Sequence, residues 1–298
     1  MTQPLLVALD PEEPLATSLA ATIGAEIAQL SRRQFPDGES YLRYDTSPNR
    51  RPVALLSSLD RPDSKFLPLV FAAATARELG AASVGLVAPY LAYMRQDKRF
   101  EPGEAVTSTH FARLLSQELD WLVTVDPHLH RHRSLAEIYS VPTIAVHAAP
   151  LLADWIRENV ERPLLIGPDS ESAQWVGAVA EAASAPHVVL EKVRHGDRDV
   201  EVSVPQVDRW KTHIPVLVDD IVSSGRTLIG TLEHLQHAGM QPPICVAVHG
   251  IFAGDAYRDL IAAGVARIVT TNTVRHQSNA IDVAPLLAGA VRDSMGDA

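Results

Sequence analysis

The stretch Ile214-Pro-Val-Leu-Val-Asp-Asp-Ile-Val-Ser-Ser-Gly-Arg-Thr-Leu228 decides the fold. It begins with an apolar run that ends in Asp219 and Asp220, as expected where a buried parallel strand opens at its carboxyl end. The loop Ser223-Ser224-Gly225-Arg226-Thr227 follows. Residues at helical spacing come next, namely Leu228, Thr231, Leu232 and Leu235. A strand, a small-residue loop and a helix bring backbone N–H groups and a positive helix end to one point, which predicts a phosphate site.

The residue types within this stretch suggest a division of roles. Gly225 lets the backbone approach an anion closely, and Ser224 and Thr227 can donate hydrogen bonds to its oxygens. Asp219 and Asp220 would repel a phosphate, so they suit the vicinal hydroxyls of a sugar phosphate or a bound magnesium ion. The alternative is an ordinary turn between strand and helix, with Ser and Thr as helix caps. Paired aspartates followed by Ser-Ser-Gly-x-Thr favour the binding site, and the loop resembles the ribose-phosphate loop of phosphoribosyltransferases.

The composition bounds the class of protein. A chain of 298 residues has room for two domains, and 46% hydrophobic with 21% charged residues is typical of a soluble globular protein with a sizeable core. The net charge of −10 argues against a surface that coats nucleic acid. Anion binding must therefore come from local basic clusters, which occur at Arg95/Lys98/Arg99, Arg131/Arg133 and Lys192/Arg194.

The single cysteine, Cys245, lies in the apolar run 244–248 and is predicted to be a core residue. One cysteine suggests no disulfide framework, so a reducing compartment is expected. The sequence begins without a basic-then-apolar signal segment, and no apolar run is long enough to span a bilayer. We therefore expect a cytoplasmic protein that has neither a membrane nor a nucleic acid as partner.

Strands and helices are predicted to alternate along the chain. Strands are expected at 5–9, 53–58, 84–88, 121–125, 164–166, 187–191, 200–204, 216–219, 244–249 and 267–271. Helices are expected at 13–23, 64–79 with Ser64 as its cap, 106–119, 149–160, 173–183, 228–239 and 285–291. Alternation of this kind predicts parallel sheets with crossover helices, whose active groups gather at the carboxyl ends of the strands. Asp126/His128, Asp169 and Asp219/Asp220 fall at such ends.

The two halves of the chain repeat one pattern. The strand 53–58, its loop, the helix to Gly80 and the strand from Val84 mirror the strand 216–219, its loop, the helix to Gly239 and the strand from Ile244. This repeat predicts two similar domains, at 1–145 and 146–283, with a C-terminal helix within 284–298 that can pack on the first. By analogy, the loop from Ser57 to Lys65 is expected to be a degenerate phosphate loop.

Several motifs in order resemble the ribose-phosphate pyrophosphokinase family. They are Phe35-Pro-Asp-Gly-Glu39, Pro89-Tyr90 with Arg95-Gln96-Asp97, Asp126-Pro-His128, Pro168-Asp169, Lys192-Val-Arg194, Asp219–Thr227 and Thr271-Asn272-Thr273. The resemblance covers nearly the whole chain. It implies an α/β fold with two tandem phosphoribosyltransferase-like (Rossmann-like) domains, each a mainly parallel sheet flanked by helices.

The resemblance also implies a reaction. Members of this family transfer the β,γ-diphosphoryl group of ATP to the 1-hydroxyl of ribose 5-phosphate and release AMP. Lys192 and Arg194, on a flap, would then be the catalytic cations that stabilise charge on the transferred group. His128 and Asp169 would hold the Mg²⁺ that accompanies ATP, with His130 as the alternative to His128. Histidine is an unusual magnesium ligand, so this pair rests on the resemblance.

The remaining positions follow the family motifs. Arg95, Gln96 and Asp97 would contact ATP. Phe35, Asp37 and Glu39 would bind the adenine in the site of a neighbouring subunit, which implies a homo-oligomer of dimer units, from a dimer up to a hexamer. Asp219 and Asp220 would bind the ribose hydroxyls, and the residues Ser223, Ser224, Gly225, Arg226 and Thr227 the 5-phosphate.

Some positions depart from the family pattern. Ser170-Glu171 follows Asp169 where the family usually has two glycines, Ser223 replaces a frequent aspartate, and His110 a frequent lysine. Because Glu171 adds a negative charge near the expected metal, one alternative is a non-catalytic homologue that regulates a partner synthetase. The other alternative is a phosphoribosyltransferase, against which the second α/β half and the Arg95-Gln96-Asp97 loop argue.

Overall fold

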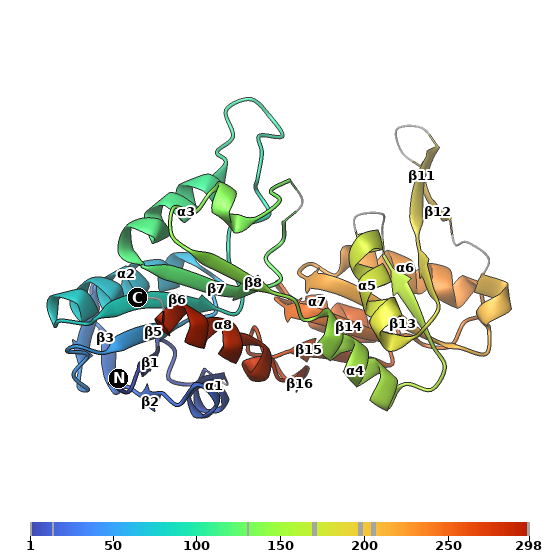
Figure 1. The fold of residues 1–298 in the computed structure, drawn as a ribbon. Helices are drawn as coiled ribbons and strands as arrows, with labels where there is room; N and C mark the ends of the chain where they lie inside the picture. Colours follow the sequence, from blue (N-terminus) through green and yellow to red (C-terminus); the bar gives the residue numbers. More distant parts are fainter. Residues whose placement is uncertain are drawn as a thin grey trace. The chain divides into compact units, whose positions relative to one another are not determined.

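The chain forms two compact units, as shown by a computed structural model that describes residues 2–13, 15–129, 131–168, 172–195, 199–203 and 207–296 (Figure 1). Unit 1 comprises Met1–His147 and Val283–Ala298, and unit 2 comprises Ala148–Asp282. Each unit has a six-stranded sheet flanked by helices. The expected α/β fold class is confirmed.

The sheet of unit 1 has the order β2-β1-β5-β6-β7-β8, and every neighbouring pair is parallel. Its strands are β1 (Leu5–Ala8), β2 (Glu26–Ile27), β5 (Pro52–Leu56), β6 (Ser83–Ala88), β7 (Trp121–Val125) and β8 (Thr143–Val146). All residues of β6 and β7 are buried, as expected for parallel strands covered on both faces. The chain moves outward from β1 to β2, returns to β5 beside β1, and then proceeds the other way. The junction of β1 and β5 is therefore the switch point of the sheet.

The helices of unit 1 are α1 (Leu15–Ile23), α2 (Asp63–Glu78), α3 (Thr107–Glu118) and α8 (Ala284–Gly296). Helix α8 packs on α1 and on strands β5 to β8, whereas α2 packs on α3, β5 and β6. A short antiparallel hairpin joins β3 (Leu30–Gln34) to β4 (Ser40–Tyr44), and a 3₁₀ turn occupies Leu135–Glu137. The final helix of the chain thus belongs to the core of unit 1.

Unit 2 repeats this architecture, with the parallel strand order β10-β9-β13-β14-β15-β16. Its strands are β9 (Pro163–Gly167), β10 (His187–Val189), β13 (Ile214–Val222), β14 (Ile244–Gly250), β15 (Arg267–Thr271) and β16 (Asn279–Ile281). Its helices are α4 (Ala149–Asn159), α5 (Ala173–Ala183), α6 (Arg226–His237) and α7 (Ala256–Ala262), with a 3₁₀ turn at Val207–Trp210. The antiparallel strands β11 (Glu191–His195) and β12 (Asp199–Ser203) form a separate ribbon. The switch point here lies between β9 and β13.

Three of the differences between the structure and the predicted elements concern where an element begins or ends. Strand β13 continues to Val222 because Ile221 and Val222 pair with His249 and Gly250 of β14, so the two aspartates lie within the strand and not at its end. Helix α2 begins at Asp63, and the Ser64 hydroxyl donates to the carbonyl of Arg61, so the prediction that Ser64 caps this helix was wrong. Helix α8 extends to Gly296, well beyond the predicted 285–291. Within the described residues, no helix is both long and apolar enough to cross a membrane.

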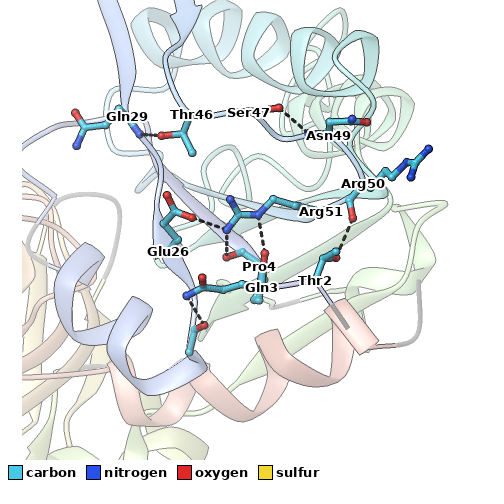
Figure 2. A network of polar contacts seen from close by, with 11 residues as sticks. Thr2, Gln3, Pro4, Glu26, Gln29, Thr46, Ser47, Asn49, Arg50 and Arg51 are labelled. Carbon is cyan, nitrogen blue, oxygen red and sulfur yellow. Dashed lines mark hydrogen bonds and ion pairs between the residues drawn. The ribbon is translucent and has the colours of Figure 1, made fainter.

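A polar network fastens the amino ends of β1, β2 and β5 (Figure 2). The Arg51 guanidinium donates to the carbonyl of Gln3 at 2.7 Å and pairs with the Glu26 carboxylate at 2.7 Å. Thr2 Oγ1 donates to the carbonyl of Arg50 at 2.9 Å. These contacts link three neighbouring strands at the edge of the sheet opposite their carboxyl ends. The functional groups of unit 1 are expected at the other end of the sheet, where the strands have their carboxyl ends.

Gly85 in β6 lies beside Trp121 in β7, and the indole occupies the space that a side chain would need. A Cβ at position 85 would lie 2.0 Å from the ring of Trp121. We expect Gly85→Ala to destabilise unit 1 by about 3 kcal/mol through overpacking, measured as a lower free energy of unfolding in urea. Gly289→Ala in α8 is the control, because a Cβ there meets no atom within 4 Å and should stabilise by about 0.5 kcal/mol. Equal effects of the two changes would contradict this packing argument.

Candidate active site

The predicted phosphate loop lies at the carboxyl end of β13. The chain leaves the strand at Val222, passes through Ser223 and Ser224, and enters α6 at Arg226. No side chain caps the first turn of α6, so the cap interpretation of this stretch does not hold in the structure. The loop is fixed by its backbone instead, because the carbonyl of Ser223 accepts a hydrogen bond from the N–H of Ala253 at 3.1 Å. The positive end of a 12-residue helix is thus held beside the hydroxyls of the loop.

Gly225 makes the turn from the loop into α6 possible. Its φ is +70°, a left-handed conformation that costs energy for residues with a Cβ. It is also buried, and a Cβ there would lie 3.3 Å from Leu260. The positive φ and the short distance to Leu260 explain why a glycine occupies this position. A glycine here also fits the predicted close approach of the backbone to an anion.

Asp219 and Asp220 are half-buried near the carboxyl end of β13. The Asp219 carboxylate accepts a hydrogen bond from the N–H of Asp220 at 3.0 Å, which orients it. Burial, and secondarily the charge of Asp219, raise the pKa of the Cys245 thiol. Cys245 is fully buried, which confirms it as a core residue.

A buried polar network next to this loop was not singled out from the sequence. His249 Nδ1 lies 2.8 Å from Thr273 Oγ1, and the hydroxyls of Thr271 and Thr273 both donate to the carbonyl of Val248, at 2.8 and 3.1 Å. His249 is opposite Ile221, one residue after the aspartate pair. The network therefore fixes the end of β14 against β13. The polar residues of the run Thr271–Thr273 were the available signal.

The loop that follows β6 carries the predicted ATP contacts in unit 1. Arg95 is exposed, whereas the Gln96 side chain accepts a hydrogen bond from the Thr107 hydroxyl at 3.1 Å. The Asp97 carboxylate is 3% exposed and accepts two hydrogen bonds from Arg131, at 2.8 and 3.1 Å. Asp97 therefore holds a second arginine beside the loop. Arg95 and Arg131 together supply cations at the carboxyl ends of β6 and β7.

His128 follows β7 and is half-buried. Because β7 is the neighbour of β6 in the sheet, His128 and the loop after β6 follow adjacent strand ends. Two residues earlier, Asp126 has a left-handed φ of 34° and is 7% exposed. Its carboxylate accepts a hydrogen bond from His147 Nδ1 at 2.9 Å, and this bond raises the pKa of His147. No group of three or more His, Cys, Asp or Glu side chains placed to hold a metal is found in the part of the chain that the structure describes. Asp169 and His130 lie outside that part.

The motif Phe35–Glu39 forms the tip of the β3–β4 hairpin. The N–H of Phe35 donates to the carbonyl of Glu39 at 2.8 Å, and the N–H of Glu39 to the Asp37 carboxylate at 3.2 Å. The Phe35 ring is 39% exposed and packs edge-on against Tyr41, with the Arg33 guanidinium 4.5 Å from its centroid. Asp37 and Glu39 are exposed as well. The tip thus presents an aromatic ring and two carboxylates to solvent.

Lys192 and Arg194 lie on β11, which projects from the sheet of unit 2 as a two-stranded ribbon with β12 (Figure 1). In the antiparallel register of the ribbon, Lys192 pairs with Val202 and Arg194 with Val200. The part of the expected flap that carries Lys192 and Arg194 is thus a strand. A projecting ribbon is suited to carry cations to a bound substrate.

The structure thus groups the predicted residues within each unit. In unit 2 it brings Asp219, Asp220 and the loop 223–227 together. In unit 1 it brings Arg95–Asp97 and His128 to one edge of the sheet. The predicted ATP and ribose-phosphate contacts fall in different units.

Unit 1 also contains a polar cavity of about 390 Å³, at the switch point of its sheet. Asp10 and Glu13 line it after β1, Ser57 and Ser58 after β5, and Lys65 in the first turn of α2. The hairpin β3–β4 supplies a further wall.

The carboxyl group of Glu13 is strongly affected by its burial in this cavity. Burial raises the pKa of its carboxyl from 4.5 to about 7. The protonated form therefore contributes stability that is complete below pH 4.5 and lost as the pH rises through 7. We expect Glu13→Gln to increase the free energy of unfolding by about 2 kcal/mol at pH 8 and to leave it unchanged at pH 4. Urea unfolding at both pH values, with exposed Glu78→Gln as the baseline, tests this; an equal gain at both would contradict it.

Comparison with known proteins bears on these groupings. The model of the N-terminal domain of ribose phosphate pyrophosphokinase matches residues 5–118, and that of the phosphoribosyl transferase domain matches residues 134–286. A ribose-phosphate pyrophosphokinase from Methanothermobacter thermautotrophicus is 30% identical over 97% of this chain and 100% of its own. One from Methanopyrus kandleri is 32% identical over 95% and 96%. The chain belongs to the ribose-phosphate pyrophosphokinase family.

A solved structure agrees with this assignment at the level of the fold. Phosphoribosylpyrophosphate synthetase from Mycobacterium smegmatis matches with a TM-score of 0.87 and covers 100% of both chains, at 24% identity. Because both units are matched, the family fold extends over the entire chain. The resemblance inferred from the ordered motifs is confirmed.

Proposed function

We propose that this chain is a ribose-phosphate diphosphokinase, which makes phosphoribosyl pyrophosphate and AMP from ATP and ribose 5-phosphate. In this reaction the 1-hydroxyl oxygen of the ribose bonds to the β-phosphorus of ATP. The bond from that phosphorus to the α,β-bridging oxygen breaks, AMP leaves, and the hydroxyl proton passes to solvent. The observation that carries the proposal is full-length similarity to relatives of this name, together with the loop at the end of β13.

The ribose 5-phosphate would bind to unit 2. Its phosphate would accept hydrogen bonds from Ser224, Thr227 and the backbone N–H groups at the start of α6, where the helix dipole favours an anion. Asp219 and Asp220 would accept hydrogen bonds from its hydroxyls. The bond that already orients Asp219 reduces the ordering cost of binding.

ATP would bind through the cations of unit 1 and a hairpin from a second copy. Arg95 and Arg131 offer positive charge to the polyphosphate, and Asp97 holds Arg131 in place. The exposed Phe35 ring would stack on adenine, while Asp37 and Glu39 accept from donors on the base. In this proposal the hairpin serves the site of a neighbouring subunit, so the active form is a homo-oligomer of dimer units, from a dimer up to a hexamer. The cytoplasm, which supplies ATP, is the proposed compartment.

Lys192 and Arg194 would act on the group being transferred. Negative charge spreads over the phosphoryl oxygens as the β-phosphorus changes partners, and two cations held on a ribbon can neutralise it. Water is excluded when such a ribbon closes on the substrate, which strengthens these interactions.

Mg²⁺ is the cofactor we propose. His128 and Asp169 would hold it, with His130 as the alternative to His128. One imidazole and one carboxylate supply only two ligands, which fits an ion that takes its other ligands from phosphate oxygens and water. Bound there, it would neutralise charge on the polyphosphate.

The test is AMP formation by the purified chain, with ATP, ribose 5-phosphate and Mg²⁺ present or omitted in turn. The proposal expects AMP only when all three are present. AMP without ribose 5-phosphate would indicate an ATP-hydrolysing enzyme. Pyrophosphate release from phosphoribosyl pyrophosphate and a base, without ATP, would indicate a phosphoribosyltransferase. Binding of ribose 5-phosphate without any turnover would indicate the regulatory homologue.

A further inference from the structure

The cavity of unit 1 occupies the place in its sheet that the phosphate loop occupies in unit 2. Both sheets have the same strand order, with β5 corresponding to β13. The loop from Ser57 and helix α2 follow β5 as Ser223–Gly225 and α6 follow β13. In open parallel sheets, ligands bind at the carboxyl ends of the strands that meet at the switch point. The repeated architecture therefore places a second candidate site at the cavity.

We propose that this cavity binds a second small phosphate ester with free hydroxyls, a sugar phosphate, at a site separate from the one in unit 2. The inference goes beyond the proposed function and does not depend on it. It rests on the cavity, on a buried carboxyl oxygen that lacks a hydrogen-bond partner within the described residues, and on the charged side chains of the cavity wall.

One buried polar atom in the cavity lacks a partner. The Oε1 atom of Glu13 is inaccessible to solvent and makes no hydrogen bond within the described residues. Buried polar groups are nearly always satisfied, because an unpaired one costs free energy. A ligand with hydroxyls could satisfy this oxygen, and its phosphate oxygens could accept from the hydroxyl of Ser57, which lines the same cavity.

The charges along the wall match such a ligand. Lys65 Nζ donates to the carbonyl of Ser58 at 2.7 Å and pairs with Asp60, so it is held at the beginning of α2 with one proton to spare. Arg32, which donates to the carbonyl of Leu9, adds further donors. Asp10 and Glu13 lie after β1 and would accept from sugar hydroxyls. The carboxylates of this wall follow β1, the counterpart of β9, whereas the aspartate pair of unit 2 lies on β13.

The volume is also suitable. A cavity of about 390 Å³ falls within the range of small-molecule sites and far exceeds the space of a bare phosphate. We therefore expect a ligand that is larger than an inorganic anion.

The test uses a pair of matched substitutions, each of which puts a carboxylate into one loop. Isothermal titration with ribose 5-phosphate should find two sites per wild-type chain. Thr227→Asp should abolish the site of unit 2, Ser57→Asp should abolish the site of the cavity, and the double variant should bind none.

The control is Arg43→Ala. Arg43 is on the β3–β4 hairpin but pairs with Asp45 outside the cavity, so this variant should retain both sites. Ser57→Ala should weaken the second site about fivefold, and its thermal unfolding shows whether the fold is intact.

Three results would overturn the proposal: a single wild-type site that Ser57→Asp retains, loss of all binding in Thr227→Asp, or two sites retained in Ser57→Asp. Inorganic phosphate tests the sugar part. It should compete at the second site at least tenfold more weakly than ribose 5-phosphate, and equal competition would overturn the roles of Asp10 and Glu13. If the chain forms no AMP but Thr227→Asp still binds ribose 5-phosphate, the cavity site stands and the proposed activity falls.

Discussion

Replacing Lys192 by alanine should lower the rate of AMP formation about a thousandfold, with little change in the KM for ribose 5-phosphate. The proposed role of Lys192 is to stabilise charge that develops only in the transition state, and removal of such an interaction lowers kcat. Losing one preorganised cation or donor at a phosphoryl-transfer site typically costs a factor on the order of 10² to 10⁵. The measurement is kcat from AMP release at saturating ATP and ribose 5-phosphate.

The matched control for this change is Lys211→Ala. Lys211 is an exposed lysine of the same unit that lies outside β11 and β12, so its loss changes the net charge equally. It should leave kcat within a factor of about two. Equal activity of the two variants would remove Lys192 from the chemistry. A large rise in KM with unchanged kcat would make it a substrate-binding residue instead.

The pair Asp219→Asn and Asp220→Asn should raise the KM for ribose 5-phosphate about a hundredfold for each substitution. Both carboxylates are half-buried, and each is proposed to accept hydrogen bonds from ribose hydroxyls. A hydrogen bond to a charged group contributes about 1.5–3 kcal/mol, which corresponds to a factor of roughly 10 to 150. Asparagine keeps the size of the side chain and loses the charge. Initial rates at varied ribose 5-phosphate give the measurement.

Asp255→Asn is the control for the aspartate pair. Asp255 is exposed in the same unit and pairs with Arg258 on the surface, so its change should leave the KM unaltered. The KM for ATP serves as an internal check, since the ribose-binding role predicts little effect on it. If the KM for ATP rises as much as that for ribose 5-phosphate, the aspartates act on the bound metal and not on the sugar.

Much of the fold could be predicted because apolar runs and helical spacing are local signals. The helix 173–183 and the strand 267–271 agree with α5 and β15 in both bounds. The end of β13 could not be predicted, since Ile221 and Val222 remain in the strand through pairing with β14, a contact distant in the sequence. The hairpin strand β3 is polar and mostly exposed, and β4 is mostly half-buried with mixed polar and apolar residues, so neither carries a strong apolar pattern.

The candidate site, like the fold, could be predicted from the sequence only in part. The loop 223–227 was predictable because glycine and hydroxyl residues before a helix are a short-range signal. The buried contacts of His249 with Thr273, and of Asp97 with Arg131, depend on strands that meet only in the folded sheet. No spacing along the chain reveals them.

The position of α8 has a consequence for how the protein is made. Unit 1 consists of the first 147 residues and of the segment from Val283, which contains α8. Unit 2 is continuous in sequence and emerges from the ribosome as one segment. Unit 1 begins to emerge first, but its core is complete only after α8 has been synthesised. The nascent chain should therefore acquire protease resistance in unit 2 before unit 1, against the usual order in which domains mature during synthesis. Chaperones that hold incomplete domains would meet the amino-terminal half for longer.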